Sequence, residues 1–243
     1  MKKIIRKPQP TCWTDAKKQG FYADLRDDKG KIRPRWLYTC IDKIDNESHI
    51  RKELLASSEC CCAYCGKRIT LEEMDVDHYL PKEAFEYLSY CWENYLPTCK
   101  PCNQNKKRDY VPDSMKSLSI KDSVINSLPT SYESYNDQKI LAKHTKRLLK
   151  PTFDEPSDHL EFDVLSHNYK AKTEIGEETK SRFFPKKKRD IANNFEVISQ
   201  AVENLLRGNH NDPLNYIQNH LIKPFGFEVY YLAYYEYWKQ FYP

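Results

Sequence analysis

Four cysteines in the first half of the chain have the spacing of a zinc site. Cys62 and Cys65 form one C-x2-C pair, and Cys99 and Cys102 form a second pair after an interval of 33 residues. Each pair can present two thiolates to one tetrahedral ion, which is how proteins bind structural zinc. Gly66 follows the first pair, where such a knuckle favours a residue that can adopt positive φ. The spacing therefore predicts one structural zinc ion held by all four cysteines.

Disulfide bonds are the alternative, because the chain has nine cysteines. An odd number fits a reducing compartment better, and the basic start of the chain lacks the apolar stretch of a secretory signal. We therefore expect a cytoplasmic protein. Cys62 is preferred as ligand because it alone leaves two residues before Cys65, although Cys60 or Cys61 could replace it; those two are expected to lie in a strand. The others are expected to be small buried hydrophobic residues: Cys12, Cys40 and Cys91.

Polar side chains suited to hydrolytic chemistry lie between and beside the two cysteine pairs. Asp77 and His78 end a short alternating segment, residues 73–79, which is typical of a strand. Asn94 precedes a second strand-like segment, and Asn103 opens a predicted helix. Strand, loop, strand and helix in this order would place His78 opposite Asn103 across a shallow groove.

Each of these residues also has a plain structural interpretation. An Asp-His pair at a strand end is usually a turn or a hydrogen-bonded histidine, and an asparagine before a strand is usually a turn residue. Asn103 could cap the second knuckle. Their joint occurrence at ordered positions within one cysteine cage favours the chemical interpretation.

This ordered set of residues resembles an HNH endonuclease, the ββα-metal fold in its four-cysteine zinc form. The third letter of the motif is here an asparagine, Asn103. The resemblance implies an α+β fold, in which a zinc-stabilised ββα-metal module lies between a helical N-terminal lead and a mainly helical C-terminal region. The matching residues are Cys62, Cys65, Asp77, His78, Pro81, Asn94, Cys99, Cys102, Asn103 and Lys106.

The resemblance also implies roles for individual residues. His78 would be the general base that takes a proton from water, since an imidazole titrates near neutral pH. Asp77 and Asn103 would supply hard oxygen ligands for a catalytic Mg²⁺ or Mn²⁺ beside the scissile phosphate. Asn94 would fix the loop that holds the histidine, and Lys106 would contact a neighbouring phosphate. The implied products carry a 5′-phosphate and a 3′-hydroxyl.

Positive charge is concentrated locally, because the formal net charge of the chain is only +4. Lys106, Lys107 and Arg108 adjoin the predicted site and are expected to bind substrate phosphates. A second cluster, residues 186–189, opens a predicted helix, and its alternative is a solvated helix face. DNA is the default substrate of the family, and RNA is the alternative.

A second resemblance concerns the HNH subunits of bacterial anti-phage systems of the Septu type and their retron-linked relatives. It is carried by the Asp-His-x-x-Pro-Lys segment at 77–82, by Trp13 and by residues 154–162. In those systems the nuclease works with a separate ATPase, which is therefore an expected partner of this chain. The alternative function is a catalytically silent zinc-knuckle subunit that binds nucleic acid or acts as an adaptor.

The rest of the chain must position this module and choose its partners. We expect an N-terminal lead at 1–57 with one helix starting at Ser48, a nuclease module at 58–112, and a mainly helical C-terminal region at 113–243. An irregular stretch precedes the helix of the lead. No segment has the 18 consecutive apolar residues that suggest a membrane span.

The C-terminal region is expected to contain one strand, at residues 159–165, among several helices. Aromatic residues of the last helix form a stripe that should face the core, at positions 227, 231, 234, 238 and 241. Tyr230 and Tyr237 lie off this stripe and should be exposed. The predicted helices cover residues 141–149, 177–184, 188–207, 213–222 and 228–241.

Overall fold

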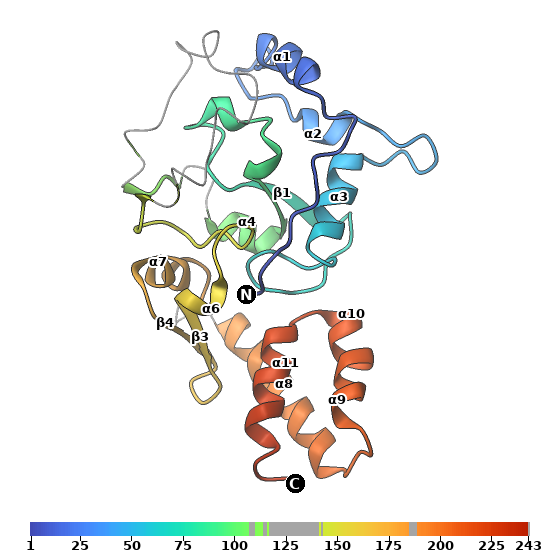
Figure 1. Ribbon diagram of the computed structural model, residues 1–243, viewed down its shortest axis with the longest axis vertical. Helices are drawn as coiled ribbons and strands as arrows, with labels where there is room; N and C mark the ends of the chain where they lie inside the picture. Colours follow the sequence, from blue (N-terminus) through green and yellow to red (C-terminus); the bar gives the residue numbers. More distant parts are fainter. Residues whose placement is uncertain (107–109, 114–115, 117–140, 142, 185–188, 243) are drawn as a thin grey trace.

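The computed structural model describes residues 1–106, 110–113, 116, 141, 143–184 and 189–242, and for residues 189–194 the backbone alone. In Figure 1 the N-terminal and central residues form the upper part of the molecule, and the C-terminal helices form the lower part. The N-terminus lies near the middle of the view and the C-terminus at the lower end. The division into three regions at residues 57 and 112 stays a prediction.

Two strands and a helix carry most of the residues singled out above. Strands β1 (Met74–His78) and β2 (Tyr95–Cys99) pair antiparallel, with His78 opposite Tyr95. Helix α4 (Lys100–Lys106) follows β2 directly. Short 3-10 turns occupy the loop between the strands, at Glu86–Leu88 and Trp92–Asn94. The predicted α+β class and the predicted order of strand, loop, strand and helix are confirmed.

The N-terminal lead contains three helices, α1 (Asp15–Ala23), α2 (Arg35–Tyr38) and α3 (His49–Ser57). The helix expected from Ser48 is α3, which buries Ile50, Leu54 and Leu55 as predicted. The other two were not expected. Helix α1 contains a central glycine and buries a lysine instead of an apolar stripe, and α2 is a single turn, so neither leaves a clear periodic signal.

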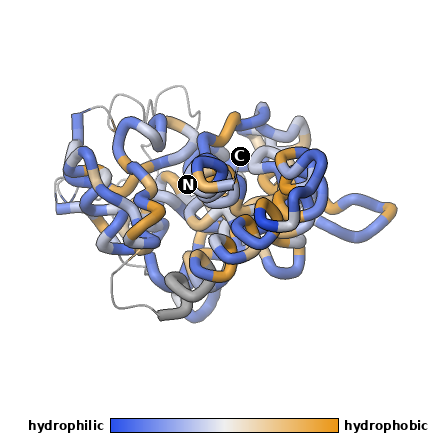
Figure 2. The backbone as a smooth tube through the Cα atoms, turned by 90° about the horizontal axis from the view of Figure 1, so that it is seen from below, coloured by the Kyte–Doolittle hydropathy of each residue, from blue (hydrophilic) through white to orange (hydrophobic). Residues whose placement is uncertain are grey.

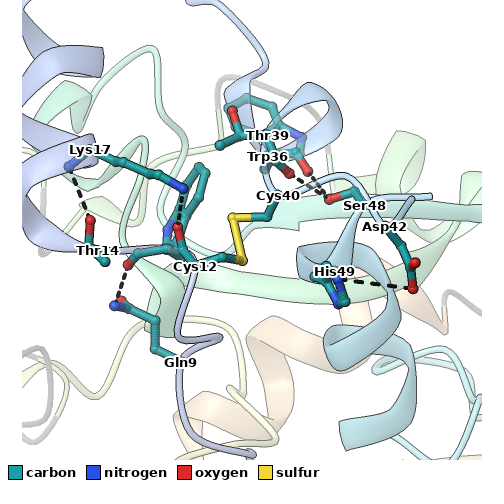
Figure 3. The surroundings of a disulfide bond; sticks show 11 residues. Gln9, Cys12, Thr14, Lys17, Trp36, Thr39, Cys40, Asp42, Ser48 and His49 are labelled. Atoms are coloured by element: carbon teal, nitrogen blue, oxygen red, sulfur yellow. Dashed lines mark hydrogen bonds and ion pairs between the residues drawn. A yellow bond between two sulfur atoms is a disulfide. The ribbon is translucent and has the colours of Figure 1, made fainter. Parts of the chain in front are cut away.

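The structure corrects the expectation for two of the remaining cysteines. Cys12 and Cys40 are joined by a disulfide bond, with their Cα atoms 5.8 Å apart. Figure 3 shows this bond between the turn before α1 and the residues that follow α2, close to Trp36. Cys91 is buried, as predicted. The sequence could not reveal the bond, because it depends on how two irregular segments come together.

Two short strands and two helices follow in the C-terminal region. Strands β3 (Leu160–Asp163) and β4 (Asn168–Ala171) form an antiparallel hairpin, so the predicted strand is present but shorter, and its partner was missed. Helix α6 (Pro156–His159) precedes the hairpin, and α7 (Glu174–Phe183) follows it. Helix α7 begins earlier than predicted because the side chain of Thr173 caps its N-terminus.

The helix predicted over residues 141–149 does not form over residues 144–149, and residue 142 lies outside the described part. This segment folds instead around a buried ion pair, in which the Arg147 guanidinium donates to both carboxylate oxygens of Asp154 at 2.7 and 2.6 Å. Asp154 also accepts from the backbone N–H of Lys150 at 2.7 Å. These bonds favour an irregular turn, since both charges must be satisfied away from water.

The remaining helices are α8 (Arg189–Arg207), α9 (Pro213–Tyr216), a π-helical segment η6 (Ile217–Ile222), α10 (Lys223–Phe225) and α11 (Glu228–Trp238). The three helices predicted here are therefore confirmed, with the last one ending earlier. The chain turns at Gly226, whose φ is 78°. Beside this turn the Phe227 N–H donates to the Gly66 carbonyl at 2.8 Å, so the C-terminal helices dock on the first cysteine knuckle.

The aromatic stripe of α11 is confirmed in part. Tyr231 and Tyr234 are buried as predicted, whereas Phe241 is 58% exposed. Tyr230, which was expected to be exposed, is 1% exposed. Its ring lies 4.9 Å from that of Phe162 on β3 and 4.5 Å from that of Phe195 on α8. Helix α11 thus packs against both the hairpin and α8, which buries more than one of its faces.

Hydrophobic positions are distributed among many short elements, as the mixed colours along the tube in Figure 2 show. Within the described part of the chain, no helix is both long and apolar enough to cross a membrane. The loop between α2 and α3 extends away from the body in Figures 1 and 2. Ile44 in this loop is 95% exposed, so the loop presents an apolar side chain to solvent.

Candidate active site

The four predicted zinc ligands come together in the structure. The sulfur atoms of Cys62, Cys65, Cys99 and Cys102 all lie within 4.8 Å of one another. The Cys65 and Cys99 sulfurs are 3.8 Å apart, and two sulfurs bound about 2.3 Å from one tetrahedral ion would be about 3.8 Å apart. The donor set therefore fits a structural zinc ion.

Local backbone geometry explains why these cysteines converge. The Gly66 N–H donates to the carbonyl of Cys62 at 3.0 Å, and its φ of 76° closes the first knuckle. The Cys99 N–H points at the Cys62 sulfur at 3.3 Å, a bond that stabilises a thiolate. Hydrogen bonding with Cys102 lowers the pKa of the Cys99 thiol. This pattern suits a metal-binding cage.

In the structure Cys62, and neither of the two cysteines before it, Cys60 and Cys61, belongs to the four-cysteine cluster. Cys61 forms an isolated bridge with Arg68, as expected of a residue that leads into the knuckle. Cys60 has a φ of 60°, so it is a turn residue and not the strand residue that was predicted.

His78 lies at the end of β1 and is 7% exposed. Its Nε2 is 3.0 Å from the Ser89 carbonyl oxygen. A carbonyl can only accept, so Nε2 carries the proton and Nδ1 keeps a free lone pair. Burial lowers the pKa of His78 to about 3, and the imidazole is therefore neutral at physiological pH. A neutral ring with an available Nδ1 is the form that a general base requires.

Two aromatic rings hold the imidazole in place. The Trp36 ring, from α2, meets the His78 ring edge to face at 4.6 Å, and the Tyr95 ring of β2 does so at 5.0 Å. The Tyr95 hydroxyl also donates to the Ser89 carbonyl at 2.7 Å. The oxygen that orients His78 is thus itself fixed, and the ring has little freedom to turn.

Asn94 makes the contacts expected of a residue that fixes the loop after the histidine. Its side-chain oxygen accepts from the Leu80 N–H at 2.8 Å, and its amide nitrogen donates to the carbonyls of Leu80 at 2.9 Å and Leu88 at 3.2 Å. These bonds connect both ends of the loop between β1 and β2. Whether catalysis depends on them stays a prediction.

Asp77 is buried and already engaged on both oxygens. The Lys106 ammonium lies 2.7 and 2.8 Å from its two carboxylate oxygens, and the Tyr64 hydroxyl donates to one of them at 2.8 Å. Lys106 is 2% exposed, so it does not lie on the surface where a phosphate contact was expected. It turns inward because the buried carboxylate needs a counter-charge. Its predicted contact with substrate stays a prediction.

Asn103, on α4, faces a second carboxylate. Its amide nitrogen donates to Asp75 at 3.0 Å, which leaves its amide oxygen as the atom suited to a cation. Asp77, His78, Asn103 and Lys106 line one cavity of about 540 Å³. The structure therefore brings together the predicted base, both predicted cation ligands and the lysine.

Sequence reasoning missed the opposite wall of this cavity. Seven residues between positions 26 and 36 of the N-terminal lead line it, including Arg26, Lys31 and Trp36. Arg26 pairs across a turn with Ile32, and its guanidinium is bonded to Glu86 in the loop between the two strands. The turn signal at Asp27–Gly30 was readable in the sequence, but nothing indicated that it would face the site.

The other predicted phosphate contacts lie outside the described residues. These are Lys107 and Arg108, together with Lys186, Lys187 and Lys188 of the second cluster; of Arg189 only the backbone is described. Their roles stay predictions.

Comparisons with known proteins agree with this geometry. A family profile described as HNH endonuclease matches residues 62–109. A Septu protein PtuB from Bacillus thuringiensis is 42% identical over 60 residues, which is 24% of this chain and 23% of that protein. A Septu protein PtuB from Bacillus mycoides is 26% identical over 133 residues, or 49% of this chain and 40% of that protein. The matched segments thus span less than half of either relative.

A more distant similarity points to the same family. A CRISPR-associated endonuclease Cas9 from Corynebacterium diphtheriae is 27% identical over 117 residues, which is 44% of this chain and 11% of that protein. No solved structure matches the chain significantly. The predicted resemblance to HNH endonucleases and to Septu proteins is confirmed.

Proposed function

We propose, from the match of residues 62–109 to the HNH endonuclease profile, that this chain is a metal-dependent endonuclease that hydrolyses phosphodiester bonds of nucleic acid. The observation that carries the proposal is the state of His78, which is buried, neutral and bonded through Nε2 to the Ser89 carbonyl. DNA is the expected substrate, with RNA as the alternative, because the site recognises a phosphodiester and distinguishes the sugar only through its surroundings.

The proposed step begins with a water molecule in the cavity. His78 takes a proton from this water at Nδ1, and the Nε2–H bond to the Ser89 carbonyl stabilises the imidazolium that forms. A substrate phosphate nearby would raise the low pKa of His78 and make it a stronger base. The water oxygen attacks phosphorus, and the 3′-oxygen leaves and is protonated by solvent, to which the imidazolium returns the proton that it took. The products therefore carry a 5′-phosphate and a 3′-hydroxyl.

Oxygen atoms of Asp77 and Asn103 would hold a Mg²⁺ or Mn²⁺ ion, and Asp75 would orient the Asn103 amide by accepting its N–H bond. Bound there, the cation would neutralise charge on the phosphate and on the leaving oxygen. The residues fit such an ion by type, since carboxylate and amide oxygens are the ligands that Mg²⁺ prefers. Asn94 would keep the loop between the strands in register with the base.

We further propose that the chain is the effector nuclease of a cytoplasmic anti-phage complex that includes an ATPase. The similarity to proteins named Septu protein PtuB supports this role. The Septu-like segment at 154–162 contributes Asp154, whose ion pair with Arg147 is structural and not catalytic.

A cleavage assay with His78→Ala tests the proposal. Wild type and variant, both loaded with zinc, are compared with Mg²⁺ or Mn²⁺ on plasmid DNA, single-stranded DNA and bulk tRNA. We expect the variant to lose cleavage by at least about 100-fold, the lower range of a general base's contribution, while zinc content and nucleic-acid binding stay unchanged. His220→Ala, an exposed histidine of the C-terminal helices, is the matched control.

The same assay separates the alternative function. If wild type and His78→Ala cut equally, the histidine is not the base and the proposed mechanism is wrong. If neither cuts, while the biological effect of the chain survives His78→Ala in full, the silent zinc-knuckle adaptor is the correct function.

A further inference from the structure

Lys106 occupies an unusual position for a lysine beside a predicted cation site. Its ammonium is within hydrogen-bond distance of three acceptors, namely both carboxylate oxygens of Asp77 and the backbone carbonyl of His78. An ammonium has three N–H donors, so all of them are used inside the protein. The side chain is 2% exposed.

Asp77 is equally committed. Among the described residues, Lys106 donates to both carboxylate oxygens of Asp77. The Tyr64 hydroxyl donates to one of these oxygens as well. Removing the positive charge that is paired with a buried carboxylate is strongly destabilising, because the remaining charge is then buried and uncompensated. Asp77 therefore needs a cation beside it at all times, and in the structure that cation is the Lys106 ammonium.

We propose that Lys106 is an internal counter-ion that competes with the catalytic divalent cation for Asp77. The Asp77 carboxylate can bind a metal ion only after Lys106 has released it. The released ammonium then carries a free positive charge at the edge of the cavity. This inference rests on the proposed nuclease function. It also reconciles the buried lysine with its predicted contact with a substrate phosphate, since both positions belong to one cycle.

The location of Lys106 makes this exchange feasible. Lys106 is the last residue of α4, and it lines the same cavity as His78 and Asn103. A long, unbranched side chain at a helix end can move its charge by several ångströms through rotamer changes without moving the backbone. Asp77 itself stays fixed, because it lies within β1 and is bonded to Tyr64.

The first test measures Mn²⁺ affinity directly, by the EPR signal of free Mn²⁺, on zinc-loaded protein at pH 8. Lys106→Met keeps the length of the side chain and removes its charge. If the lysine holds Asp77 in at least nine molecules of ten, we expect Lys106→Met to bind Mn²⁺ about tenfold or more tightly. Asp77→Asn should lose this Mn²⁺ site, and Lys100→Met, an exposed lysine of the same helix, should bind as wild type does.

The second test uses the unmodified chain, so that it does not depend on the folding of a variant. Lysines are acetylated with and without Mn²⁺, and the modification of each lysine is followed by peptide mass spectrometry. We expect Lys106 to be protected without Mn²⁺ and to become reactive when Mn²⁺ is added, with Lys100 reactive in both cases.

Two results would overturn the inference. One is an equal or weaker Mn²⁺ affinity in a Lys106→Met protein that has full zinc content and a normal circular dichroism spectrum. The other is protection of Lys106 that does not change with Mn²⁺. If either occurs while His78→Ala still abolishes cleavage, the counter-ion role is wrong and the nuclease function stands.

Discussion

Single side chains hold the candidate site together through hydrogen bonds to the surrounding fold. His78, Asn94 and Asp77 are each buried, and each is bonded to partners in the loop, on the neighbouring helix or on the first knuckle. Such groups contribute little net stability when satisfied, but leaving one partner unpaired costs the full desolvation penalty of that group. At this scale these bonds hold the site in one arrangement, and they leave the Nδ1 atom of His78 available.

Asn94→Ala tests this dependence. The substitution leaves the N–H and the carbonyl of Leu80 without their Asn94 partners, and it leaves the Leu88 carbonyl with the Cys91 N–H alone among its described donors. We therefore expect the free energy of unfolding to fall by about 2–4 kcal/mol. Urea unfolding of zinc-loaded protein measures the change. Asn211→Ala, at an exposed position, should leave the stability within about 0.5 kcal/mol of wild type. A loss as small as the control's for Asn94→Ala would show that the loop does not depend on this clamp.

Whole secondary-structure elements orient His78, the proposed base. Helix α2, which the sequence did not reveal, places Trp36 against the His78 ring and lines the cavity with the preceding residues. The carbonyl of Trp36 accepts from the Ser48 hydroxyl at 2.8 Å, which ties α2 to the start of α3. The disulfide between Cys12 and Cys40 joins the same region to the turn before α1 (Figure 3). The N-terminal lead is therefore part of the site.

Substitutions of Trp36 should change the orientation of the His78 imidazole without changing substrate binding. Trp36→Ala frees the imidazole to turn, and misplacing a catalytic group by about 1 Å can cost about 100-fold. We expect kcat to fall by about 10–100-fold with KM nearly unchanged, and Trp36→Phe to recover most of the activity because an aromatic edge is restored. Steady-state kinetics, on the nucleic acid that the cleavage assay identifies as substrate, measure both kcat and KM. A fall in zinc content, or a change in KM alone, would contradict a positioning role.

At the scale of the whole molecule, a close backbone contact at Gly226 attaches the C-terminal helices to the first cysteine knuckle. A Cβ atom on Gly226 would lie 2.4 Å from the Gly66 carbonyl oxygen and 2.5 Å from the Arg68 nitrogen. The φ of 78° at Gly226 is also a conformation that other residues rarely adopt. Metal binding, the knuckle and the docking of α11 are thus linked through adjacent backbone atoms.

Gly226→Ala should loosen this attachment. We expect the free energy of unfolding to fall by at least about 2 kcal/mol, since backbone strain and a clash with fixed atoms add together. Limited proteolysis should also cut more readily between the knuckle region and α11. Gly20→Ala is the control, because nothing lies within 4 Å of its Cβ and α1 should gain about 0.5–1 kcal/mol from the change. Equal stability in both variants would refute the tight contact.

The sequence alone predicted the central module and its candidate site residues. Two C-x2-C pairs need only local knuckles and one ion to meet, and alternation of residue types along residues 73–79 predicts β1, while β2 and α4 were expected from the residues beside the second pair. Helical spacing of apolar residues predicted α3, α8 and α11. These features depend on neighbours within a few positions, which is the range over which a sequence pattern carries structural information.

Only the tertiary structure decided what surrounds that chemistry. The Lys106 charge turns inward to Asp77, Trp36 packs on His78, and Cys12 meets Cys40, each across a separation of 28 residues or more. Tyr230 is buried because two elements pack on α11 at once. Long-range contacts of this kind follow from how the elements pack, and no local pattern encodes them. The sequence therefore identified candidate reacting groups, and the fold determined which partners each of them has.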